Sequence, residues 1–190
     1  LVSVIGSRMN KVIKISLSFF TLLVVFSFTN PDRKMERLVN KLWKDIECTI
    51  TSVHVEDPLE SLTKLNAIYT TDGNTLLGYA CYTYSHGCRI GGCSAPSAKA
   101  DDTYDVFEYI IIYDTKMNIL KIDISDYGGE YGYEICRAKW LKQFNGKSSG
   151  FILEENIDGI SGATVSATYL IDDVNILGKY LKKLKVENAI

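Results

Sequence analysis

Residues 156–167 read NIDGISGATVSA, in which an Asp-Gly pair typical of turns leads into small residues and then into an expected helix. This order predicts that the hydroxyl of Thr164 lies in the first turn of that helix. Unpaired backbone N–H groups and the positive end of the helix dipole gather there, and both favour a phosphate. The alternative is that Ser161 is an ordinary N-cap and Thr164 an incidental hydroxyl, because Ser and Thr are preferred in helix caps.

The size and charge of the chain limit what it can be. Its 190 residues suffice for one well-buried domain and are few for two. The formal net charge of -2 and the lack of a dense basic block argue against nucleic acid as a partner. The sequence shows no nicotinamide-binding glycine fingerprint and no Ser/His/Asp set. We therefore expect a single domain over residues 31–190, preceded by a leader over residues 1–30.

The leader has the order of an export signal. Met9, Lys11 and Lys14 precede an apolar run over 15–28, which is short against the about 20 residues of a membrane-spanning helix. The run lacks a clear small-x-small cleavage site, so a removed signal peptide and an uncleaved membrane anchor both stay open. Either outcome exports the domain to the periplasmic or extracytoplasmic face of the cytoplasmic membrane.

Apolar spacing predicts an α+β fold in which an antiparallel sheet meander packs with helices. The Asp72-Gly73-Asn74 sequence is typical of a hairpin turn, because Asp and Gly tolerate positive φ angles. A long C-terminal helix is expected over 165–185, where leucines recur at intervals of three and four residues. Strands are expected over 49–55, 65–71, 75–84, 104–113 and 119–125, and further helices from after Asp32 to Ile46 and over 130–144.

Residues 158–164, DGISGAT, resemble the covalent flavin-attachment motif of the FMN-binding domain family. That family includes the flavin-carrying subunits of the Rnf and sodium-pumping NADH:quinone oxidoreductase complexes. In its pattern an Asp is followed three residues later by Ser or Thr, then by Gly-Ala, then by the Thr or Ser that is esterified to the FMN phosphate. Every one of these positions is matched here, and Thr164 falls on the acceptor.

The resemblance extends upstream and covers roughly residues 65–180. Gly78-Tyr79 is similar to a Gly-Tyr strand entry of the family, and 110–124 to its central hairpin. Residues 140–146, WLKQFNG, are similar to the helix end before the attachment site. The chain departs from the family at 127–132, where YGGEYG stands in place of the frequent Glu-Thr-Pro-Gly-Leu-Gly.

The resemblance implies an exported flavoprotein that carries FMN as an electron carrier in a membrane-associated redox chain, either as an electron-transfer flavoprotein or as an oxidoreductase subunit. A separate flavin transferase with magnesium would take FAD, join its FMN part to Thr164 and release AMP. The phosphate would lie against Ser161, Gly162, Ala163 and Val165, Asp158 would shape the turn or assist the transferase, and Tyr131 with Gly132 would line the flavin ring. Two other functions stay open: a noncovalent flavin-dependent reductase, and an extracytoplasmic binding domain without flavin.

Residues 85–94, SHGCRIGGCS, form a glycine-rich stretch with two cysteines. In an exported protein a disulfide between Cys88 and Cys93 is the plain interpretation. A redox-active dithiol near the flavin is a second interpretation, and a pair of reduced thiols is a third. A metal site completed by Cys81 and His86 is the fourth, although this spacing matches no standard zinc pattern.

Overall fold

The computed structural model describes residues 31–56, 58–89 and 104–190. The predicted signal or anchor over 1–30 therefore lies outside the described residues. The described residues from Met35 onward form one compact unit. Within the described part of the chain, no helix is both long and apolar enough to cross a membrane.

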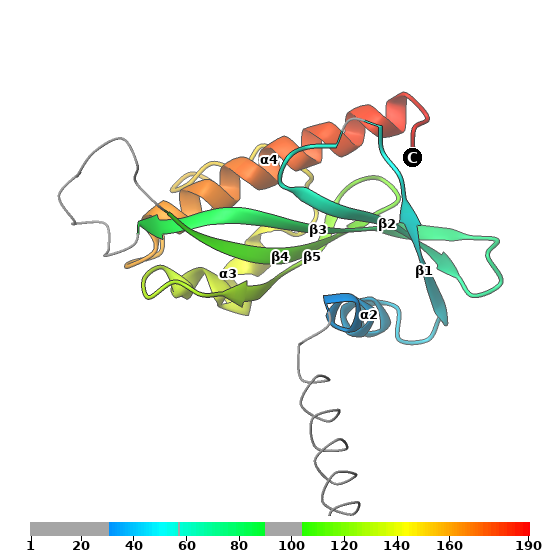
Figure 1. The fold of residues 1–190 in the computed structure, drawn as a ribbon, viewed down its shortest axis with the longest axis horizontal. Helices are drawn as coiled ribbons and strands as arrows, with labels where there is room; N and C mark the ends of the chain where they lie inside the picture. Colours follow the sequence, from blue (N-terminus) through cyan, green and yellow to red (C-terminus); the bar gives the residue numbers. More distant parts are fainter. Residues whose placement is uncertain (1–30, 57, 90–103) are drawn as a thin grey trace, which may run out of the picture. The chain divides into compact units, whose positions relative to one another are not determined.

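The described strands form one antiparallel sheet in which each strand pairs with its neighbours in the sequence, in the order β1-β2-β3-β4-β5 (Figure 1). The α+β fold and the antiparallel meander are thus confirmed. Several strands differ in length from the expectation, and β3 runs on through the first residues of the predicted cysteine loop. The strands are β1 (Cys48–Val53), β2 (Leu62–Thr70), β3 (Leu76–Arg89), β4 (Tyr104–Asp114) and β5 (Ile119–Tyr127).

Two aspartates fix the hairpin turns. The Asp72 carboxylate accepts hydrogen bonds from the backbone N–H of Asn74 at 3.1 Å and from its side-chain amide at 3.0 Å. The Asp114 carboxylate accepts from the backbone N–H of Asn118 at 2.8 Å. A side chain that bonds the backbone two to four residues later mimics a turn. The register of β2 with β3 and of β4 with β5 is therefore set by local chemistry.

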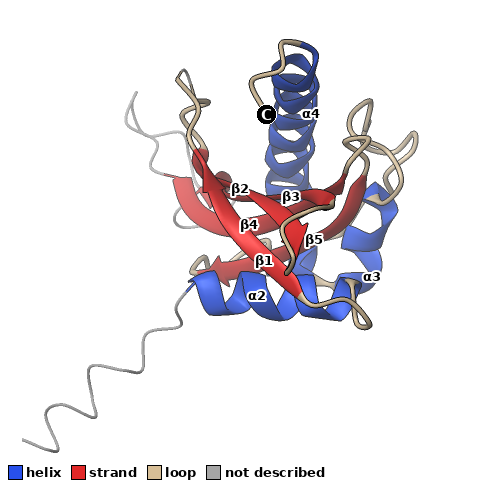
Figure 2. Cartoon of the chain, turned by 90° about the vertical axis from the view of Figure 1, so that its right-hand side faces the viewer, coloured by secondary structure: helices blue, strands red, loops and turns tan. Residues whose placement is uncertain are grey.

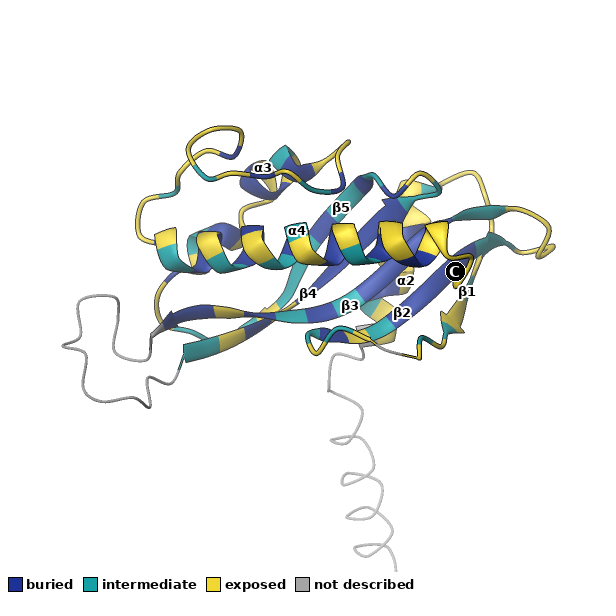
Figure 3. Cartoon of the chain, turned by 90° about the horizontal axis from the view of Figure 1, so that it is seen from above, coloured by how far each residue is buried: buried dark blue, intermediate teal, exposed yellow. Residues whose placement is uncertain are grey.

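Strand alternation gives the sheet two apolar faces. On β4, Tyr109, Ile111 and Tyr113 belong to the core cluster under α4 (Thr164–Val186). The intervening Ile110 and Ile112 instead pack with Met35 and Val39 of α2 (Pro31–Leu42) on the opposite face (Figure 2). Because successive side chains of a strand point to opposite sides, the stretch 109–113 of β4, which is buried on both faces, is hydrophobic at every position. Figure 3 shows that α4 keeps its buried residues toward the sheet and its exposed residues outward.

The helix predicted over 130–144 is wrong. The segment forms three short turns: η1 (Tyr133–Cys136), α3 (Ala138–Leu141) and η2 (Lys142–Phe144). Gly132 has a left-handed φ of 90°, and Arg137 is extended with ψ 119°, so a continuous helix is interrupted at both residues. The first predicted helix also ends early, at Leu42 rather than Ile46, because the chain turns back there to enter β1.

Candidate functional site

Thr164 is the first residue of α4, and its side chain is exposed. The N-cap is Ala163, so the alternative assignment of Ser161 as N-cap is wrong. Ala163 has no side-chain acceptor, and among the described residues no side chain caps this helix. The first intrahelical bond runs from the N–H of Ala167 to the carbonyl of Ala163 at 2.9 Å. The N–H groups of the first turn are thus left for a solvent molecule or a ligand.

The turn before α4 is fixed through its backbone. The indole N–H of Trp140 donates to the carbonyl of Asp158 at 2.8 Å, and the N–H of Asp158 donates to the side-chain oxygen of Gln143 at 2.9 Å. The carboxylate of Asp158 stays on the exposed side. Gly162 has a left-handed φ of 84°, which turns the chain into the helix. The segment η2 and its neighbours therefore act as a support for the motif.

The loop after β5 packs against the first turn of α4. The Tyr127 hydroxyl donates to the carbonyl of Tyr131 at 2.5 Å and lies 2.9 Å from the hydroxyl of Ser166. A methyl group built on Gly132 would lie only 2.3 Å from that Ser166 hydroxyl. The structure thus brings Gly132 against the same helical turn as Thr164. Tyr131 remains 47% exposed, and its contact with a flavin ring stays a prediction.

Ser166 and Tyr127 were not expected at the site. Ser166 is fully buried, and its hydroxyl donates to the sulfur of Cys88 at 3.7 Å. Burial raises the pKa of the Tyr127 phenol above its usual range. The ring of Tyr127 stacks on Phe107 with 5.3 Å between centroids, which holds its hydroxyl in place. The only sequence signal for this contact was a small polar residue at the start of the helix.

Glu134 is the third unexpected residue. A methyl group built on Gly162 would lie 3.3 Å from Oε1 of Glu134, so the carboxylate lies beside the motif. Its Oε2 is buried and has no hydrogen-bond partner in the described part of the chain. The residue belongs to η1, which Gly132 and Arg137 delimit. No periodicity or motif in the sequence pointed to it.

The structure describes Cys81, His86 and Cys88 of the cysteine-rich stretch and its surroundings, but not Cys93. Cys93 lies outside the described residues, so the Cys88–Cys93 disulfide stays a prediction. Cys81 is fully buried in the sheet, and burial raises the pKa of its thiol well above the usual range. His86 is exposed. Over the described ranges, no three His, Cys, Asp or Glu side chains are grouped so that they could hold a metal ion.

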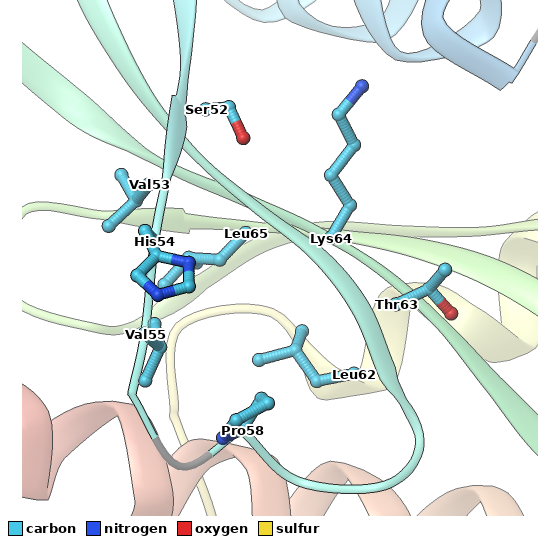
Figure 4. A pocket seen from close by; sticks show the side chains of 9 residues that line it. All are labelled: Ser52, Val53, His54, Val55, Pro58, Leu62, Thr63, Lys64 and Leu65. Carbon is cyan, nitrogen blue, oxygen red and sulfur yellow. The ribbon is translucent and has the colours of Figure 1, made fainter.

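Two cavities lie at the opposite end of α4 from Thr164. One, of about 280 Å³, opens between the end of β1 and the start of β2 and is lined by His54 and Leu62 among others (Figure 4). The other, of about 450 Å³, lies between His54 and the last turns of α4, including Lys183 and Leu184. Twenty helical residues span about 30 Å. Neither cavity can therefore receive a group attached near Thr164 at the start of the helix.

No protein-family model matches the chain, and the search of curated proteins found no match either. The function is therefore inferred from the residues around the start of α4 and from the resemblance of residues 158–164 to the attachment motif.

Proposed function

We propose that this protein is an extracytoplasmic flavoprotein that carries FMN on Thr164 through a phosphoester and acts as an electron carrier in a membrane-associated redox chain. The observation that carries the proposal is the placement of Thr164. Its hydroxyl is exposed at the uncapped start of a 23-residue helix, at the acceptor position of the resembling motif.

The residues around Thr164 suit a phosphate. The N–H groups of Thr164, Val165 and Ser166 are the ones that an α-helix leaves unpaired, and the helix dipole adds positive potential there. Gly162 and Ala163 have almost no side chain, so a phosphate group has room to approach the backbone there. Ser161 is exposed just before them and can offer its hydroxyl. These features support an anionic group joined to the Thr164 oxygen.

The flavin ring needs a second contact region. Gly132 lies against the first turn of α4, and Tyr131 next to it has 47% of its surface exposed. An exposed tyrosine next to a residue that packs on this turn can lie flat against an isoalloxazine ring. When bound, FMN supplies one- and two-electron transfer, and the protein contributes position and electrostatic environment.

Attachment would require a partner. A free threonine hydroxyl is a weak nucleophile, so its esterification with the FMN part of FAD needs activation by another group. A flavin transferase using FAD and magnesium would supply the FMN part and release AMP. The carrier would then exchange electrons with membrane redox partners.

The test compares two threonines on one face of α4. Thr168 is exposed one turn after Thr164, and its hydroxyl donates to the Thr164 carbonyl at 2.9 Å. Co-expression of the full chain with a flavin transferase should give a yellow protein whose mass rises by one FMN and whose colour survives denaturation. Thr164→Ala should lose the adduct, and Thr168→Ala should keep it.

An undiminished adduct in the Thr164→Ala variant would place the attachment elsewhere and refute the proposal. Flavin released on denaturation of the wild-type protein would instead favour a noncovalent flavin-dependent reductase. A wild-type protein that takes up no flavin from a competent transferase would favour an extracytoplasmic binding domain.

A further inference from the structure

Glu134 presents an unsatisfied carboxylate to the attachment motif. Its Oε2 is buried without a hydrogen-bond partner among the residues that the structure describes, while its Oε1 lies against Gly162. Nearly all buried polar groups in proteins are hydrogen-bonded, because an unmet acceptor loses its water without compensation. An unmet carboxylate oxygen therefore calls for a proton, a water molecule or another donor from a ligand.

The neighbouring helix start makes this placement more unusual. The first-turn N–H groups of α4 also lack a side-chain acceptor in the described structure, although the Glu134 carboxylate lies beside Gly162, two residues before that turn. A carboxylate that served only as a cap would accept from these N–H groups. Glu134 accepts no hydrogen bond from them in the described structure. Both the first-turn N–H groups and Oε2 of Glu134 are therefore available to a ligand.

The turn that follows Gly132 holds Glu134 in this position. The left-handed Gly132 begins η1, and the Arg137 N–H donates to the Glu134 carbonyl at 3.2 Å to close the turn. Gly162 in turn has no side chain to separate the carboxylate from the motif backbone. Gly132 and Gly162, both with positive φ, thus allow the Glu134 carboxylate to lie close to the attachment motif.

We propose that Glu134 is the proton acceptor of the flavin-attachment reaction, an inference that rests on the function proposed above. The Thr164 oxygen forms a bond to the phosphorus of the FMN part of FAD, and the bond from that phosphorus to the bridging oxygen breaks. AMP leaves with the electron pair, and the Thr164 proton passes to Glu134, directly or through one water molecule. The donor molecule is FAD, and no oxidant or reductant is needed.

The same proton transfer avoids repulsion between two negative charges once FMN is attached. An ionised Glu134 beside an FMN phosphodiester would place two negative charges next to each other. Once it has taken the Thr164 proton, the carboxyl is neutral and can donate a hydrogen bond to a phosphate oxygen. Oε2 of Glu134 would thus gain a hydrogen-bond partner only after FMN is attached.

The test measures the initial rate of FMN attachment to the purified full chain, with a flavin transferase, FAD and magnesium, by intact mass. Glu134→Gln keeps the shape but cannot accept the proton, so the rate should fall about 100-fold or more, as for the loss of a general base. Glu134→Ala should be equally slow, and added formate should partly restore its rate. The matched control is Glu154→Gln, because Oε1 of Glu154 would lie 3.3 Å from a methyl group on Gly159 of the same motif and the residue is exposed.

The outcomes separate this inference from the proposed function. Circular dichroism and thermal unfolding first show which variants are folded. A folded Glu134→Gln or Glu134→Ala variant that is modified at the wild-type rate overturns the role of Glu134, even when Thr164→Ala is still unmodified. Equal slowing by Glu154→Gln, or no rescue by formate, also overturns it. A wild-type chain that takes no FMN, or a Thr164→Ala variant that does, refutes the proposed function itself.

Discussion

Replacing Gly132 by alanine tests how closely the loop after β5 packs on α4. The new methyl group would lie 2.3 Å from the Ser166 hydroxyl and 2.5 Å from the Tyr127 hydroxyl. Ser166 could rotate its hydroxyl away, but the Tyr127 ring is held by its stack on Phe107. The loop or the first turn of α4 must therefore move.

The cost has two parts. A residue with a Cβ at the φ of 90° found for Gly132 loses about 1–2 kcal/mol relative to glycine. Overpacking in a filled contact adds about 1–3 kcal/mol. The free energy of unfolding should therefore fall by about 2–5 kcal/mol, and for a domain of this size each kcal/mol lowers Tm by about 2–4 °C.

Gly146→Ala is the matched control, because Gly146 has a φ of 85° and no described atom lies within 4 Å of the new methyl group. It should show only the backbone cost, about 1–2 kcal/mol. Urea unfolding followed by tryptophan fluorescence gives both free energies of unfolding. Equal losses in the two variants would show that Gly132 is required for its φ alone, and that the close contact with Ser166 and Tyr127 does not exist in solution.

Three further predictions concern side chains around α4. Tyr127→Phe removes the hydrogen bond to the Tyr131 carbonyl, so urea unfolding should show a loss of about 1–2 kcal/mol, and an unchanged value would contradict the observed contact. Asn175→Ala removes a side chain that bonds both the N–H of Phe151 at 3.0 Å and its carbonyl at 2.8 Å, which should cost about 2–3 kcal/mol in the same assay. Burial raises the pKa of Asp173, so its contribution to stability is present below the unfolded pKa of about 4 and is lost as pH rises through the folded pKa. Asp173→Asn should therefore stabilise the fold at pH 7 and have little effect at pH 3, and an equal gain at both pH values would refute this sign.

Local chemistry explains what the sequence determined by itself. The Asp72-Gly73-Asn74 turn and the apolar alternation of β4 and β5 predicted the meander, because turn geometry and strand period depend on neighbouring residues. The spacing of leucines predicted α4 to within a residue or two at each end. The position of Thr164 at the helix start followed from the same local pattern.

Contacts between distant residues were decided only by the tertiary structure. The spacing of Ile135, Leu141 and Phe144 suggested a helix over 130–144. All three side chains are buried, yet three separate short turns bury them. Ser166 meets a tyrosine 39 residues away and a cysteine 78 residues away, and no local pattern encodes such separations. The same holds for the Glu134 carboxylate beside Gly162. A sequence records which side chains can form a turn or a helix face, whereas only packing of the whole chain determines which of them share a site.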